Sequence, residues 1–182
     1  MPHSEIPLPP AFSEEDFDAL LLEAAGLPAG LPMGRAAPGM PPIELAAMRD
    51  RFSRGLHAVR ACTSRGEYVA VWLEAWVEEE VDAVFAASPE RGFWLHALAL
   101  ALCLAATRGA APEAAACGCA SVPVPDAELA AALNLAGLAC ADANGQAARL
   151  HRRYAVLTHA GACGCGVCAL AEGCPRLRSV SV

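Results

Sequence analysis

The chain has 182 residues, of which 55% are hydrophobic and 18% are charged, so it is long and apolar enough to fold as one domain with its own core. Its formal net charge is −7, and its thirteen basic residues are all arginines without a basic tract, which argues against a nucleic-acid partner. Nine cysteines and an N-terminus without a secretory pattern favour a reducing cytoplasm over a disulfide-bonded secreted fold.

The N-terminal segment is rich in proline, which removes backbone donors and fixes φ. We therefore expect residues 1–41 to be mostly irregular, with one short helix that follows Ser13 and ends at Gly26. Residues 42–182 are expected to form a helical domain. Its first helix begins at Pro42 and carries an apolar stripe at Met48, Phe52, Leu56 and Val59.

The rest of the chain shows helical periodicity and no alternating strand pattern longer than a few residues. Helices are predicted over residues 67–85 and 88–106. The second helix is apolar nearly all round, which predicts that it lies in the middle of a bundle. Its apolar run is shorter than the roughly 20 residues that span a bilayer, so no membrane partner is expected. Asp126 is expected to cap a further helix. A last helix is predicted to carry Leu150, Tyr154 and Leu157, which makes the predicted fold all-α, a bundle of five or six helices.

The cysteine-rich loop at residues 161–175 is the clearest functional signal. Four thiols lie within twelve residues and alternate with glycines that let the backbone wrap closely around a metal centre. Thiolates are soft ligands that suit zinc, Cu(I) or iron–sulfur centres. The Cys-x2-Cys step and the proline after the last cysteine favour an iron–sulfur cluster, whereas a closed tetrahedral zinc site is the alternative. The predicted metal ligands are Cys163, Cys165, Cys168 and Cys174.

Other residues are weaker candidates. Cys117 and Cys119 repeat the Cys-Gly-Cys pattern of the loop and are either incidental thiols or secondary ligands of the same metal. His159, just before the loop, is either an extra ligand or a hydrogen-bond donor to a ligand. The remaining cysteines, Cys62, Cys103 and Cys140, are expected to be small core residues. Three arginines on one face of the predicted last helix are either a solvated face or a contact for an anion or an acidic partner: Arg149, Arg152 and Arg153.

The chain resembles the NifQ family of nitrogen-fixation proteins over approximately residues 90–175. The last three cysteines of that family have the spacing of Cys165-x2-Cys168-x5-Cys174. The family's first cysteine would fall at Ala160. Either Cys163 takes the place of that cysteine, or the cluster has three cysteine ligands. The stretch Phe93–Cys103 resembles a Trp-Leu-Ala helix of the family. Asn144 and the run Arg149–Tyr154 resemble the helix that precedes the family's cysteines.

This resemblance implies a protein that holds a 4Fe–4S or 3Fe–4S cluster, takes up molybdenum from molybdate and donates it to the nitrogenase cofactor-assembly proteins. No nucleophile–base pair is apparent in the sequence, so we expect a metal donor and not an enzyme. The alternatives are an iron–sulfur module for electron transfer or redox sensing, and a structural zinc protein that acts as an adaptor.

Overall fold

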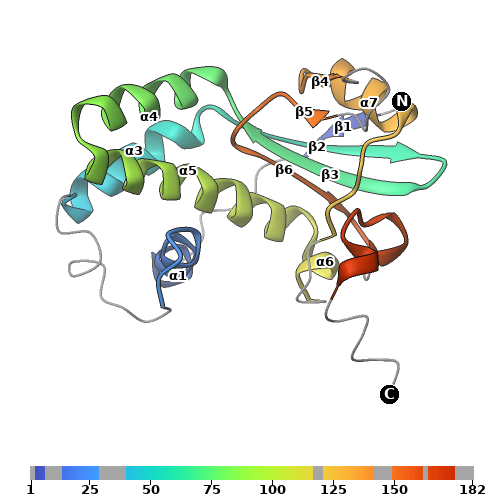
Figure 1. Cartoon of the computed structure of the whole chain (residues 1–182), viewed down its shortest axis with the longest axis horizontal. Coiled ribbons are helices and arrows are strands. Elements are labelled where there is room, and N and C mark those ends of the chain that lie inside the picture. The colour runs from blue at the N-terminus through green and yellow to red at the C-terminus, as the bar shows by residue number, and fades with distance from the viewer. Residues whose placement is uncertain are drawn as a thin grey trace.

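The computed structural model describes residues 3–6, 14–28, 40–116, 121–141, 149–161 and 164–174. Four antiparallel strands form one sheet in the order β1-β2-β3-β6, and two short strands pair separately (Figure 1). The predicted all-α fold is therefore wrong, because helices and a sheet are combined. The strands are β1 His3–Glu5, β2 Leu56–Thr63, β3 Gly66–Leu73, β4 Cys140–Ala141, β5 Arg149–Leu150 and β6 Ala155–His159.

The β2–β3 hairpin forms the centre of the sheet. A tight turn at Ser64-Arg65 joins the two strands, and Gly66 adopts a φ of +138, a conformation that L side chains rarely accept. Side chains of β3 alternate between two separate cores. Val69, Val71 and Leu73 lie in one core, while Tyr68, Ala70 and Trp72 lie in the other.

The larger core lies between the sheet and a layer of helices. These are α1 Glu14–Ala24, α3 Pro42–Ser53, α4 Ala75–Ala87 and α5 Pro89–Ala110. The long helix α5 runs across one face of the sheet with α4 and α1 packed against it (Figure 1). Its buried residues are mostly alanine and leucine, which confirms the helix predicted over residues 88–106. Its predicted place in the middle of a helix bundle is wrong, because α5 lies between the sheet and the other helices. Close packing of α4 on α5 depends on Gly92, where a Cβ would lie 2.6 Å from Phe85 Cα.

The smaller core covers the opposite face of the sheet through α7 Ala127–Leu135. Asp126 Oδ1 accepts a hydrogen bond from Leu129 N at 2.9 Å, which confirms the predicted cap. A short helix, α6 Pro112–Ala116, links the end of α5 to this part of the chain. Three helix predictions are wrong in whole or in part. The helix that begins at Pro42 ends at Ser53, so Leu56 and Val59 of its predicted stripe belong to β2. Residues 66–73 form β3 before α4 begins, and β5 and β6 replace the last helix.

The N-terminal segment contributes to both the sheet and the larger core. β1 pairs with β2, and Phe17, Leu20 and Leu21 of α1 are buried against α5. Residues 7–13 and 29–39 of the stretch predicted to be irregular lie outside the described residues. Within the described ranges, α5 is long and apolar enough to cross a membrane. However, 67% of its most apolar stretch is buried in the fold, and helices in protein cores often have the same length and composition.

Candidate metal centre

The cysteine loop follows β6 as two short 3-10 helices, η1 Gly164–Val167 and η2 Ala171–Gly173. Backbone hydrogen bonds repeat at every third residue. Cys168 N donates to Cys165 O at 3.3 Å, Ala171 N donates to Cys168 O at 3.1 Å, and Cys174 N donates to Ala171 O at 3.2 Å. Because a 3-10 helix has three residues per turn, Cys165 and Cys168, which the η1 turn joins, project from the same side. Cys174 follows η2, a separate turn that begins after Cys168, Ala169 and Leu170.

The loop is anchored on the segment that precedes α7. Ala169 N donates to Val122 O at 2.8 Å, and Pro123 and Cys168 form an isolated antiparallel bridge. Val122 N also donates a hydrogen bond to Cys168 Sγ at 3.5 Å. Hydrogen bonds from backbone N–H groups stabilise negative charge on sulfur and tune the potentials of iron–sulfur centres. This arrangement suits a thiolate that binds a metal.

Glycine and serine bring the two anchoring segments into close contact. A Cβ on Gly164 would lie 2.7 Å from His159 Cβ and 2.8 Å from Ser121 Oγ. The Ser121 hydroxyl accepts a hydrogen bond from His159 N at 3.1 Å, so its position is fixed by β6. Only a residue without a side chain fits between Ser121 and His159. These contacts set the position at which the loop leaves the sheet.

His159 is held by the residues around it. Gly161 N donates to His159 Nδ1 at 3.2 Å, which uses the lone pair of that nitrogen, and a Cβ on Gly66 would lie 2.6 Å from Nε2. The ring also packs edge-on against Tyr68, with 5.4 Å between centroids. Among the described residues, a hydrogen bond reaches Nδ1 and the Gly66 backbone lies close to Nε2. These contacts hold the ring next to the loop, and the role of His159 as a metal ligand stays a prediction.

The described thiols are accessible. Cys165, Cys168 and Cys174 are all half-buried, and two apolar neighbours are exposed, Val122 by 49% and Leu170 by 63%. In the described part of the chain, no three His, Cys, Asp or Glu side chains converge closely enough to hold one ion. The donor set itself consists of soft thiol sulfurs, which are the ligands that iron–sulfur centres and zinc require. The residues present therefore fit a thiolate-bound metal.

The other predicted cysteines divide into three groups. Cys163, Cys117 and Cys119 lie outside the described residues. Cys103 and Cys140 are buried as predicted, and burial raises the pKa of the Cys103 thiol to about 12 and raises the pKa of Cys140 as well. Cys62, which was predicted to be a core residue, is exposed on β2.

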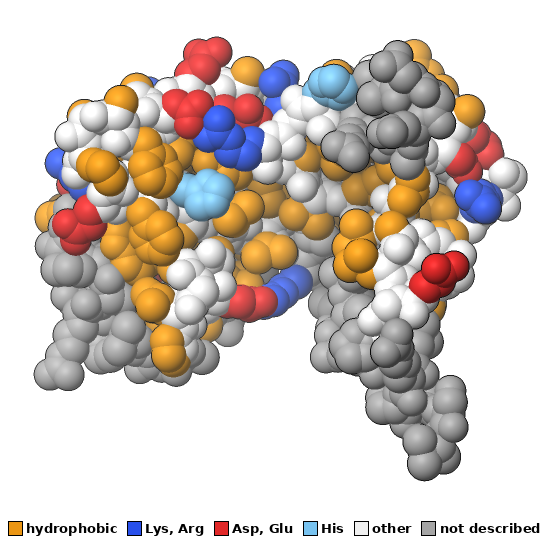
Figure 2. Space-filling model, in the orientation of Figure 1, with side chains coloured by type: hydrophobic (Ala, Val, Ile, Leu, Met, Phe, Trp, Pro, Cys, Tyr) orange, Lys and Arg blue, Asp and Glu red, His pale blue; other side chains and the backbone are white. Residues whose placement is uncertain are grey.

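The three arginines do not share a helical face, because their segment is not helical. Arg149 belongs to β5, and Arg152 and Arg153 precede β6. Arg153 donates to both carboxylate oxygens of Asp82 on α4, at 2.5 and 2.9 Å. This bidentate contact lowers the pKa of Asp82 and raises that of Arg153. On the face drawn in Figure 2, acidic and basic side chains accordingly lie next to one another over α4.

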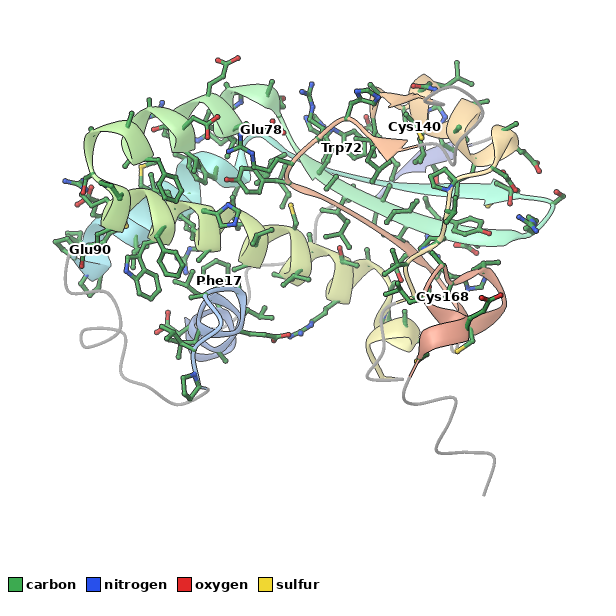
Figure 3. The ribbon with its side chains drawn as sticks, in the orientation of Figure 1. Phe17, Trp72, Glu78, Glu90, Cys140 and Cys168 are labelled. Atoms are coloured by element: carbon green, nitrogen blue, oxygen red, sulfur yellow. The ribbon has the colours of Figure 1, made fainter. Side chains whose placement is uncertain are left out.

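Strand β6 separates these arginines from the cysteine loop. Its five residues span roughly 16 Å at about 3.3 Å per residue. Glu78, which accepts a hydrogen bond from Arg153 N at 2.9 Å, lies far from Cys168 in Figure 3. The pKa of Glu74, just before α4, is lowered chiefly by the hydrogen bond from His57. The charge of Arg152 also lowers it, so Arg152 lies close to the start of α4. An arginine does lie beside the loop, but it is Arg60.

Arg60 was not identified from the sequence. It lines a cleft of about 270 Å³ together with Ala160 and Gly161, at the start of the loop. Its guanidinium pairs with Glu67 and donates to Ala110 O at 2.9 Å. Ser121, Val122 and Gly164 were also missed as positioning residues. The one sequence feature that pointed to this segment was Cys117-Gly-Cys119, which repeats the pattern of the loop and directly precedes Ala120 and Ser121.

Comparison with known proteins identifies no relative: no family model, curated protein or solved structure matches the chain.

Proposed function

We propose that this chain is a non-enzymatic iron–sulfur protein whose cluster is bound by the C-terminal thiols. The ligands are Cys165, Cys168 and Cys174, with Cys163 as the fourth. The observation that supports this proposal is one anchored loop with three half-buried thiols, spaced three and six residues apart in the sequence. The N–H group of Val122 at the Cys168 sulfur adds a donor of the kind that surrounds cluster thiolates.

Iron–sulfur is favoured over structural zinc by the ligand pattern. Zinc ribbons pair two Cys-x2-Cys knuckles, whereas the loop has one, Cys165 to Cys168. An accessible cluster also suits a protein that exchanges metal. When bound, the cluster would supply sulfide ligands for a further soft metal. The chain's own residues hold and orient the thiolates: Ser121 and His159 fix the start of the loop, and Val122 fixes its middle.

The resemblance to NifQ identifies the proposed cargo as molybdenum, delivered to nitrogenase cofactor-assembly proteins. Of the two stretches outside the cysteine loop that resemble the family, one is helical in the structure and the other is not. Phe93–Cys103 is helical within α5, like its counterpart in the family, whereas the run Arg149–Tyr154 is not helical. The cysteine spacing and α5 therefore support the cargo assignment. Arg153 is paired with Asp82 at the far end of β6, so we place no molybdate site there.

The test is metal analysis of protein purified without oxygen from cells supplied with iron and molybdate. Iron, acid-labile sulfide, molybdenum and zinc are measured per chain. The proposal predicts iron and sulfide together, in equal amounts for a 4Fe–4S cluster and in a ratio of three to four for a 3Fe–4S cluster. Molybdenum should be bound in addition and lost when the cluster is removed. Iron and sulfide without molybdenum would contradict the cargo and favour an electron-transfer or redox-sensing module. One stoichiometric zinc in a colourless, air-stable protein would contradict the cluster.

A further inference from the structure

The sequence Cys165-Gly-Val-Cys168 forms one turn of 3-10 helix, closed by the hydrogen bond from Cys168 N to Cys165 O. Three residues at about 2.0 Å rise each, on the same side of the helix, place the two Cα atoms roughly 6 Å apart. Disulfides join residues whose Cα atoms are about 4.4–6.8 Å apart. The backbone therefore already has the spacing that a disulfide between these two residues needs.

The environment of the two thiols leaves them accessible. Both are half-buried, unlike the buried thiols of Cys103 and Cys140. Gly166, between them, has open space where a Cβ would project, so the turn is not packed tightly at this position. The Val122 N–H donates to Cys168 Sγ at 3.5 Å.

We propose that Cys165 and Cys168 form a reversible disulfide when the centre is empty, and that low-molecular-weight disulfides are the oxidant. The thiolate of one cysteine attacks a sulfur of the oxidant, which forms a mixed disulfide and releases one small thiolate. The second cysteine then attacks the mixed disulfide through its own sulfur. This step forms the Cys165–Cys168 bond and releases the second small thiol, so two protein thiols are oxidised and one oxidant disulfide is reduced.

This disulfide makes metal binding depend on redox conditions. Two of the proposed metal ligands are consumed when it forms, so the oxidised loop cannot hold the cluster, and reduction by a thiol restores the ligands. This regulatory consequence rests on the proposed function. The disulfide itself does not, because it requires only the apo protein. Cys174, six residues from Cys168 along the chain, lies outside this turn.

The experiment uses the full-length apo protein and oxidised glutathione. Remaining thiols are blocked with a light alkylating reagent, the disulfides are reduced, and the released thiols are labelled with a heavy reagent. Trypsin then yields one peptide, residues 154–176, that contains all four cysteines of the loop, and fragmentation locates the label. We expect heavy label on Cys165 and Cys168 and light label on Cys163 and Cys174.

The variants Cys168→Ser and Cys62→Ser separate the proposal from general thiol oxidation. In Cys168→Ser, the mixed disulfide with glutathione should persist at Cys165, while Cys62→Ser should behave like the wild type. Heavy label on another pair, or an equal spread over the four cysteines, would overturn the proposal. So would the absence of any intramolecular disulfide. A protein that forms the expected disulfide but binds no iron would contradict the proposed function and leave this inference intact.

Discussion

Gly164 is the position at which a single methyl group should test the geometry of the metal loop. Its backbone φ is not in the left-handed region, so the effect of Gly164→Ala is steric. The new Cβ would lie 2.7 Å from His159 Cβ, which is 0.7 Å closer than the 3.4 Å at which ordinary contact begins. His159 belongs to β6 and is paired with Tyr68 of β3, so it cannot easily move. The loop must shift instead.

The cost follows from the contacts that this shift breaks. The Ser121 hydroxyl can turn away from the new methyl group only by releasing His159 N, a hydrogen bond worth about 1 kcal/mol. Methyl groups inserted into a tight contact typically cost about 1–3 kcal/mol. If the same loop position is needed for metal binding, this energy lowers the affinity roughly five- to hundredfold, at about 1.4 kcal/mol per factor of ten.

The assay compares Gly164→Ala with Gly166→Ala, which lies on the other side of Cys165 and has open space at its Cβ position. Gly166→Ala should change the free energy of unfolding by no more than about 0.5 kcal/mol and leave the iron content unchanged. Gly164→Ala should lower both, as measured by urea denaturation of the apo protein and by iron analysis. Equal behaviour of the two variants would refute the proposed positioning of the loop by Ser121 and His159.

Three further changes test the rest of the structure. Burial, and secondarily the charge of Arg153, lower the pKa of His96 in the folded protein below its ordinary value of 6.5. The unfolded chain therefore binds a proton more readily, and the free energy of unfolding should fall as the pH drops below 6.5. The variant His96→Gln should flatten this pH dependence in urea titrations. Arg153→Gln should lower the urea midpoint by removing the contact with Asp82, without changing the iron content, because the pair lies away from the loop. Gly92→Ala should destabilise the protein by about 1–3 kcal/mol in the same assay, since its Cβ would meet the backbone of Phe85.

The helices with a clear cap or a long apolar run were predictable from the sequence. Asp126 marks the start of α7, and the apolar run from Trp94 identifies α5. Strand β3 was not predictable, because both of its faces are buried and its residues do not alternate between apolar and polar. Val69, Trp72 and Trp76 are also spaced as on a helix, which made β3 and α4 look like one element.

For the cysteine loop, the sequence predicts ligand types and nothing of their supports. The spacing of Cys165, Cys168 and Cys174 predicts a thiolate site, since soft ligands at such density have few other uses, and this site stays a prediction. Its supports were not predictable, because Ser121 and Val122 are more than forty residues away and meet the loop only through the tertiary fold. The arginines were misplaced for a related reason: once β6 replaces the predicted helix, Arg153 lies next to α4.

The central claim, that the C-terminal thiols bind an iron–sulfur cluster, is tested most directly by the iron and sulfide content of Cys168→Ala. Both variants of the comparison, Cys168→Ala and the exposed control Cys62→Ala, are purified without oxygen alongside the wild type. We predict that Cys168→Ala loses iron and sulfide together while remaining folded, and that Cys62→Ala retains both. Equal iron and sulfide in Cys168→Ala and in the wild type would contradict the claim.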